Sequence, residues 1–366
     1  MGASLNTDPA RKGVTLVEIL VVIVIIGILT GLIMGALGPA RAKTRRTLIK
    51  KEISQLEMAL NTYKTEFSET PPTFLNIDIE VERGGDRTLQ DDGRNAVMRH
   101  IRKAFPRYVP RTTTATDPDG RLAAAVPPIT DYDRFAADVW YAYGRTVDPL
   151  KFDAASSLLF FLGGLPEAIP PAGGAWIPAG FHTDPTFPFK PGLPRTQPSY
   201  QFVLERIVFH ESHYSDPTDA SSLPVDRYLR YYPQGVEGAD GAPFVYFKAR
   251  RIGGAWQYGS RDGSSPANFL QFYYPHAVVG LELGNYCVPY RDPAPQVRWR
   301  NYENFQIICA GLDGHFGNRA PVDYAKAGAD KSNYRESKTG RYYFSDYDYD
   351  NLTNFSDNML EDEISQ

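Results

Sequence analysis

The stretch that decides the fold runs from Arg11 to Pro39 and reads RKGVTLVEILVVIVIIGILTGLIMGALGP. From Val14 to Leu37 it is almost wholly apolar and carries one charge, that of Glu18. At about 1.5 Å of rise per residue, a helix of this length can cross a bilayer. We therefore predict a transmembrane helix over residues 14–37, with one acidic side chain near its start.

Glu18 needs a positive partner, because burying an isolated carboxylate in hydrocarbon costs at least a few kcal/mol. Arg11 and Lys12, followed by Gly13, come directly before the apolar run, so the Gly13–Val14 bond resembles a processing site. Cleavage there would create an α-amine four residues before Glu18, at a helix N-terminus that already favours negative charge. The sequence thus predicts an α-amine as the partner of this carboxylate.

The segment KGVTLVEIL, residues 12–20, resembles the class III signal of type IV prepilins and type II secretion system pseudopilins. In that family a membrane peptidase cuts after the glycine, the new N-terminus is methylated, and the glutamate aligns each subunit with its neighbour in a filament. The resemblance implies processing at Gly13 and Val14 by a prepilin peptidase/methyltransferase and an assembly role for Glu18. Val14 replaces the usual Phe, a tolerated departure. An ordinary signal anchor that contains a glutamate is the alternative.

The helical pattern continues beyond Pro39 to Phe67, because apolar residues recur every three or four positions. These residues are Leu48, Ile53, Leu56, Leu60 and Tyr63. We predict one helix over residues 14–67, bent near Gly35, Gly38 and Pro39. The residues ALNTYK at 59–64, followed by TPP at 70–72, resemble the junction between helix and head in major pseudopilins.

We divide the chain into a leader (residues 1–13), the long helix (14–67) and a periplasmic or extracellular head (68–366). The resemblance places the whole protein in the bacterial inner membrane as a single-pass subunit, with a cytoplasmic N-terminus before processing. Residues from about 74 to 280 exceed what an ordinary pilin head requires and form a loop-rich insertion.

A basic segment after the apolar run conflicts with this orientation, because the positive-inside rule would place it in the cytoplasm. Its members are Arg41, Lys43, Arg45, Arg46, Lys50 and Lys51. We follow the processing motif, whose peptidase acts on the cytoplasmic face. The basic side chains then face lipid headgroups or acidic residues on neighbouring subunits. DNA binding, as in uptake pili, is a weaker alternative, and we expect no nucleic-acid partner.

The head is predicted to be α+β and pilin-like, with an antiparallel sheet packed on the second half of the long helix. Helices are expected at 95–105, after Gly93, and at 154–164, where Asp153 supplies the N-cap. Aromatic residues make residues 165–198 an ordered loop. Strands are expected at 200–209, 244–249, 269–274 and 305–310.

The C-terminal region contains FQIICAGLDGHFG at 305–317 and SDYDYDNLTNF at 345–355. Together they resemble the end of major pseudopilins, where a loop between the two segments binds calcium through acidic side chains and backbone carbonyls. The best matches are Asp313, Asp348 and Asp350, although the insertion at 319–343 lengthens the loop. A cation would relieve the repulsion between these carboxylates. The alternative is a solvated acidic turn.

The chain has two cysteines, Cys287 and Cys309. A disulfide between them would close a short loop and contribute about 3 kcal/mol outside the cytoplasm, and many pilins carry a C-terminal disulfide. Two buried thiols are the alternative, because Cys309 lies in an apolar, strand-like run.

Composition gives no sign of a nucleic-acid-binding or disordered protein, since the net charge is −4 and 42% of the residues are hydrophobic. His210 and His213 lack the spacing of a zinc protease motif, so we predict no enzyme. A signal-anchored periplasmic enzyme or carbohydrate-binding protein remains the alternative to a filament subunit.

Overall fold

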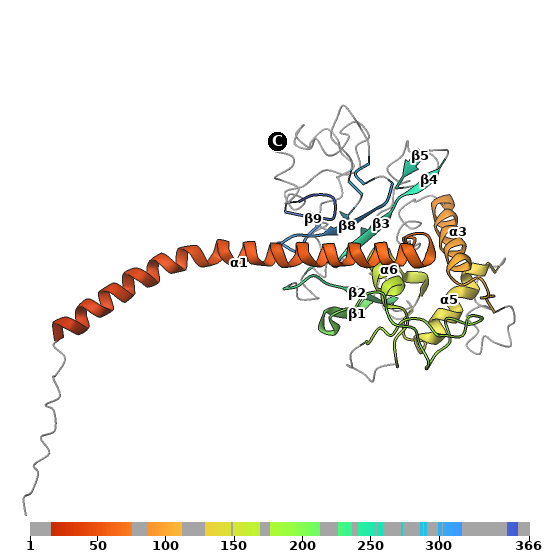
Figure 1. Cartoon of the computed structure of the whole chain (residues 1–366), viewed down its shortest axis with the longest axis horizontal. Helices are drawn as coiled ribbons and strands as arrows, with labels where there is room; N and C mark the ends of the chain where they lie inside the picture. Colours follow the sequence, from red (N-terminus) through yellow and green to blue (C-terminus); the bar gives the residue numbers. More distant parts are fainter. Residues whose placement is uncertain are drawn as a thin grey trace, which may run out of the picture. The chain divides into compact units, whose positions relative to one another are not determined.

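The computed structural model describes residues 16–74, 87–111, 129–147, 149–168, 176–212, 226–235, 241–252, 255–258, 272–273, 286–287, 289–290, 299–301, 303–316 and 350–357. The chain divides into two compact units, Met1–Thr47 and Leu48–Gln366. Helix α1, Leu16–Phe67, runs through the boundary between them (Figure 1). It ends at the predicted residue, and the chain leaves it towards Pro71 and Pro72.

The second half of α1 supplies one wall of the core of the Leu48–Gln366 unit, which unites that half of the helix with the head. Five of its side chains are at most 1% exposed and recur every three or four residues, as a helix with one buried face requires. They are Ile49, Ile53, Leu56, Leu60 and Tyr63. The predicted stripe included Leu48 in place of Ile49, but Leu48 is 38% exposed. The buried face therefore begins one residue later than predicted.

The main sheet has three antiparallel strands in the order β3-β8-β9. These strands span Val245–Lys248, Phe305–Cys309 and Leu352–Thr353. Ile307 pairs with Tyr246, and Ile308 pairs with Thr353. All residues of the central strand are buried, which fits a strand covered on both faces. The predicted α+β, pilin-like class is thereby confirmed.

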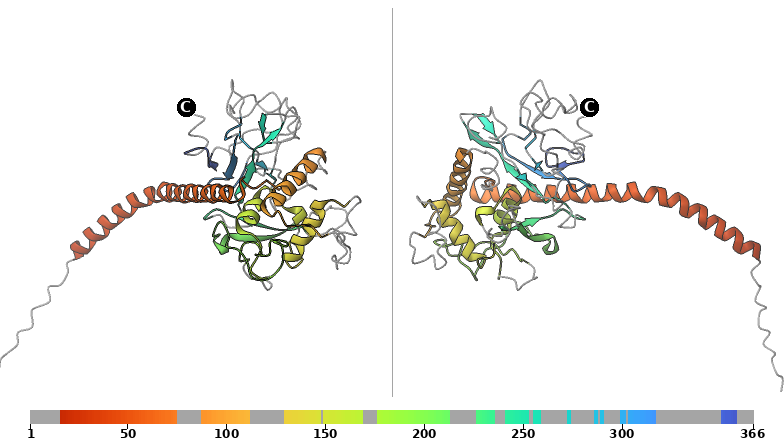
Figure 2. Two further views of the ribbon diagram at one scale, coloured as in Figure 1. Left: turned by 45° about the vertical axis from the view of Figure 1, so that its right-hand side comes forward. Right: turned by 180° about the vertical axis from the view of Figure 1, so that it is seen from behind.

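Among the residues that the structure describes, the other strands form three separate antiparallel pairs, so the single sheet predicted from the sequence is wrong in extent there. The pairs are β1 (Ile207–Ser212) with β2 (Asp226–Tyr231), β4 (Arg250–Ile252) with β5 (Ala255–Gln257), and β6 (Phe272–Tyr273) with β7 (Tyr286–Cys287). The strand predicted at 200–209 is also too long, because a 3₁₀ turn, η4 (Leu204–Arg206), occupies its middle. In the views of Figures 1 and 2, the main sheet and the β1-β2 pair lie on opposite sides of the second half of α1.

Short helices fill the first part of the head: α3 (Arg87–Ala104), α5 (Asp131–Ala142), η2 (Pro149–Lys151), α6 (Ala154–Leu158) and the π-helical turn η3 (Leu159–Gly163). The predicted cap of α6 is confirmed, because Asp153 Oδ1 accepts hydrogen bonds from the amides of Ala155 and Ser156, both at 2.9 Å. Helix α3 begins at Arg87 rather than 95 and contains Gly93. The predicted glycine boundary is therefore wrong.

Helix α5 was not predicted, although its start has a local signal. The Thr130 side chain accepts a hydrogen bond from the Asp133 amide at 3.2 Å, and the Asp133 carboxylate accepts from the Thr130 amide at 2.8 Å. This reciprocal pair is a capping box, formed here with Asp in place of the usual Glu.

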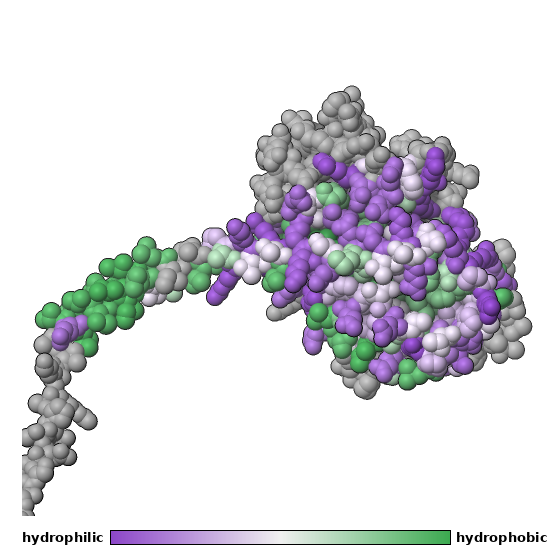
Figure 3. All heavy atoms as spheres, viewed as in Figure 1, coloured by the Kyte–Doolittle hydropathy of each residue, from purple (hydrophilic) through white to green (hydrophobic). Residues whose placement is uncertain are grey.

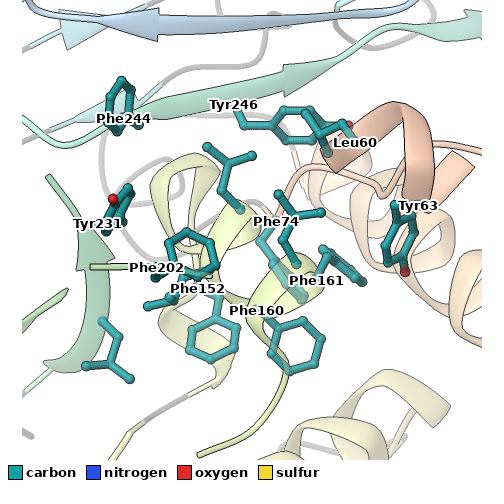
Figure 4. Close-up of a cluster of buried hydrophobic side chains, with 14 of the residues drawn as sticks. Leu60, Tyr63, Phe74, Phe152, Phe160, Phe161, Phe202, Tyr231, Phe244 and Tyr246 are labelled. Atoms are coloured by element: carbon teal, nitrogen blue, oxygen red, sulfur yellow. The ribbon is translucent and has the colours of Figure 1, made fainter. Parts of the chain in front are cut away.

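Aromatic side chains from distant segments form the centre of the head core (Figure 4). Phe74, which follows α1, stacks on Phe161 with ring centroids 5.1 Å apart, and Phe160 lies edge-on to both rings. The loop after η3 adds Phe181 and Phe189, each in contact with Phe160. The described part of the 165–198 loop is therefore ordered by its aromatic residues, as predicted.

Candidate functional site: the N-terminal helix

The first half of α1 is covered by exposed apolar side chains. Its large apolar residues from Leu16 to Leu37 that the structure describes are 42–80% exposed, and Figure 3 shows hydrophobic side chains gathered along this part of the helix. A contiguous apolar surface of this kind marks a site of contact with lipid or another protein. This surface is the principal candidate functional site.

Glu18 lies in the first turn of α1 and is exposed. It is the only charged residue between Leu16 and Ala40. The hydroxyl of Thr30, the polar side chain within this apolar half, donates to the Ile26 carbonyl at 2.7 Å, so it is satisfied within the helix. The predicted processing residues Gly13 and Val14 lie outside the described residues, and processing there stays a prediction.

The apolar half of α1 is bent, as predicted. Within the described residues no single straight helix has both the length and the apolar character of a membrane span. Segments Leu16–Leu32 and Leu37–Phe67 meet at 42° and together have the length and composition required. The bend falls beside Gly35 and shortly before Gly38 and Pro39. Pro39 lies inside the helix, and glycine and proline are common causes of such bends.

Comparison with known proteins identifies this segment. Residues 8–34 match the family model of the prokaryotic N-terminal methylation motif. The N-terminal segment of this chain resembles that of prepilins and pseudopilins. The match covers Glu18 and the apolar half of α1 as far as Met34, so the methylation motif and most of the exposed apolar surface coincide.

Two curated relatives extend the likeness beyond the motif. The type II secretion system core protein G of Klebsiella michiganensis is 42% identical over 64 residues, which cover 18% of this chain and 45% of the relative. The protein of the same name from Pectobacterium carotovorum subsp. carotovorum is 32% identical over 107 residues, covering 29% of this chain and 64% of the relative. The chain thus spans about half to two thirds of their lengths, and no solved structure matches it.

Polar contacts join the second half of α1 to the head. Lys50 Nζ donates to the carbonyl oxygen of Thr353 at 2.6 Å and to that of Ser356. The C-terminal strand β9 is therefore held to the helix by a basic residue. The sequence offered this lysine only as one member of a basic run and gave no signal of its partner.

Glu52 forms a second contact, buried beside the apolar stripe of α1. Its two oxygens accept hydrogen bonds from the Arg206 guanidinium at 2.6 and 2.7 Å, and one of them accepts from the Tyr231 hydroxyl at 2.5 Å. The side chains of Glu52 and Arg206 are 7% and 18% exposed. Sequence reasoning missed this pair, although an acid at the edge of an otherwise apolar helix face signals a buried partner.

A third contact secures the end of α1. His100 is 1% exposed and joins the Tyr63 hydroxyl at 2.8 Å to the Glu69 carboxylate at 2.8 Å. The hydrogen bond with His100 is the main reason that the pKa of Glu69 falls to about 2. Burial lowers the pKa of His100 below its usual value, and burial likewise lowers that of Lys248 to about 8.

The C-terminal acidic residues are brought together in part. Asp350 Oδ2 accepts hydrogen bonds from the amides of Leu312 and Asp313 at 2.6 and 3.1 Å, so two of the three predicted calcium ligands meet at one turn. Gly311 permits this approach, because its φ is +64° and a Cβ there would lie 2.3 Å from the Asp350 carbonyl oxygen. Asp348 lies outside the described residues, among which no group of three or more metal-ligating side chains is found.

Cys287 and Cys309 are both buried but belong to different core clusters. Cys309 ends the central strand β8, and Cys287 ends β7. No disulfide joins these two described residues in the structure. Their pairing therefore rests on the family resemblance and stays a prediction.

Proposed function

We propose that this protein is a non-enzymatic structural subunit of a type II secretion pseudopilus or a type IV pilus-like filament. It is processed after Gly13, anchored in the bacterial inner membrane by the first half of α1, and assembled through that helix. Its partners are a prepilin peptidase/methyltransferase and other pilin or pseudopilin subunits, and its head lies in the periplasm or on an exported filament.

The observation that carries this proposal is the position of Glu18. It is the one acid on an exposed apolar helix, and it follows a glycine and two basic residues at the family spacing. A membrane anchor alone has no need of a carboxylate there, since an acid in hydrocarbon is unfavourable. A filament of packed helices needs this carboxylate, because each Glu18 can meet the α-amine of a neighbour.

The mechanism is electrostatic alignment. A processed Val14 carries a cationic amine, and pairing that amine with a neighbouring Glu18 fixes the axial offset between two helices. Removing one partner leaves a buried charge uncompensated, which costs about 3–5 kcal/mol. Misaligned packing is thereby penalised at each subunit contact.

The first test is the mass of the N-terminal peptide of protein extracted from membranes that contain the prepilin peptidase. We expect a methylated Val14. An intact leader would overturn the proposal and favour a signal-anchored enzyme or carbohydrate-binding protein.

The second test compares Glu18→Ala with Glu66→Ala, which removes an exposed acid from the same helix outside the apolar half. Filament yield is measured by shearing and sedimentation. We expect loss of filaments only for Glu18→Ala. Normal filaments from both variants would show that the alignment mechanism is wrong.

We also propose that the turn at Gly311–Phe316 binds calcium in the head. The Asp350 carboxylate supports this, because it lies against the turn and accepts a hydrogen bond from the Asp313 amide, and Ca²⁺ takes carboxylate and backbone oxygens. The test is the melting temperature of the full chain in detergent, with calcium or with a chelator. Calcium should stabilise the wild type and leave Asp313→Asn unchanged, whereas equal melting curves for the wild type would refute binding.

A further inference from the structure

Four basic side chains follow the apolar half of α1 directly. We call Arg41, Lys43, Arg45 and Arg46 the basic collar. At about 1.5 Å of rise per residue they lie about 6 to 14 Å along the axis beyond Leu37, the last large apolar residue before them. Arg41 and Lys43 are exposed, and Arg45 and Arg46 are half-buried.

The collar has no acidic residues near it along the helix. From Ile19 to Lys51 the sequence contains no Asp or Glu. The usual pairing of acids and bases three or four residues apart is therefore absent on this part of α1. A concentration of positive charge of this kind attracts an anionic surface.

The distribution of the collar around the helix indicates the shape of that surface. At about 100° per residue, positions 41, 43, 45 and 46 point at about 0°, 200°, 40° and 140° around the axis. They cover more than half of the circumference. A single neighbouring subunit would contact one side of the helix, whereas a bilayer surface surrounds a helix that emerges from it. The arrangement favours the bilayer.

We infer that the basic collar binds the anionic phospholipid headgroups of the membrane that holds the apolar half of α1. The inference rests on the proposed membrane anchoring and adds the class of lipid that is recognised. The polar layer on each side of a bilayer is about 5–8 Å thick, and long basic side chains extend their charged ends into it. The collar thereby fixes the depth of the helix before assembly.

The test uses the full-length protein reconstituted in vesicles. One set contains phosphatidylcholine alone, and the other contains phosphatidylcholine and phosphatidylglycerol in a ratio of about 7:3, a composition rich enough in anionic lipid to set a negative surface potential. Electron paramagnetic resonance compares the binding of spin-labelled phosphatidylglycerol and spin-labelled phosphatidylcholine to the protein. We expect a preference for phosphatidylglycerol of at least about fivefold, the effect of one favourable basic contact, and its decline at high salt.

Two variants separate the collar from general charge. The first replaces all four collar residues with Gln. The control removes four exposed basic residues of the head instead, namely Arg99, Arg107, Lys190 and Arg251. The collar variant should lose the lipid preference, and the control should keep it.

Alkaline carbonate extraction of each preparation reports insertion separately. Extraction of the wild type from the vesicles would refute the proposed anchor itself. A wild type that stays inserted without preferring phosphatidylglycerol would overturn the collar inference alone. Loss of filaments in the collar variant without any lipid preference in the wild type would assign the collar to a neighbouring subunit and also overturn the inference.

Discussion

Replacing Glu52 tests how much its buried contact with Arg206 stabilises the packing of the head on α1. This carboxylate is 7% exposed and accepts three hydrogen bonds, two from Arg206 and one from Tyr231. Glu52→Ala leaves the Arg206 guanidinium, 18% exposed, without its anionic partner. Breaking a buried pair on one side costs about 3–5 kcal/mol. Because Arg206 is still reached by solvent, we expect the lower end, about 3 kcal/mol.

The assay is urea unfolding of the full chain in detergent micelles, followed by tryptophan fluorescence. Arg102→Gln is the matched control, because Arg102 and Asp131 form an ion pair whose side chains are 57% and 41% exposed. Its loss should change the unfolding free energy by less than about 1 kcal/mol. The double variant Glu52→Leu with Arg206→Met should recover part of the stability, because an apolar pair carries no desolvation penalty.

The reasoning would be refuted by a Glu52→Ala variant within about 0.5 kcal/mol of wild type, well below the cost of a broken buried pair. The same holds if the double variant is less stable than Glu52→Ala. Either result would mean that solvent replaces the carboxylate and that apolar contacts alone hold α1 in the head.

Three further predictions concern other contacts of the head. The folded-state pKa values of Glu69 and His100 both lie below their ordinary values of 4.5 and 6.5, so the folded state binds these protons less readily than the unfolded state. The stability that these two groups contribute is therefore fully present above about pH 6.5 and is lost as the pH is lowered towards 2. The melting temperature should decrease between pH 7 and pH 4, and it should decrease less steeply for His100→Gln than for the wild type. Equal slopes for the two proteins would contradict this. Gly311→Ala should destabilise the C-terminal turn by about 1–3 kcal/mol in urea unfolding, because a side chain at positive φ is strained and its Cβ meets Asp350, whereas a neutral result would show that the turn rearranges. Lys50→Met removes the bonds to the C-terminal carbonyls, so limited proteolysis should cleave the C-terminal segment sooner than in wild type, and unchanged cleavage would count against this role.

The features that the sequence predicted correctly are local ones. The end of α1 at Phe67 follows from an apolar repeat that stops and from two prolines beyond it. The cap by Asp153 depends on amides two and three residues away. A helix or a cap is determined within one or two turns of chain, so neighbouring residues carry the information.

Misplaced boundaries arose where packing outweighed a local preference. Gly93 lies inside α3 and is buried, so contacts there offset the roughly 1 kcal/mol that glycine costs within a helix. The strand-like run at 200–209 turns at Leu204 before it pairs with β2.

Helix α5 was missed because Asp133, rather than a glutamate, completes its capping box.

The sequence by itself determined the prepilin segment, the single acid within it and the length of α1, because each depends on residue type and spacing along one helix. Only the tertiary structure decided which distant groups meet. Glu52 finds Arg206 across 154 positions of the chain, and Lys50 finds Ser356 across 306. Contacts between residues so far apart in the sequence depend on the geometry of the whole core, and no pattern within a few residues specifies that geometry.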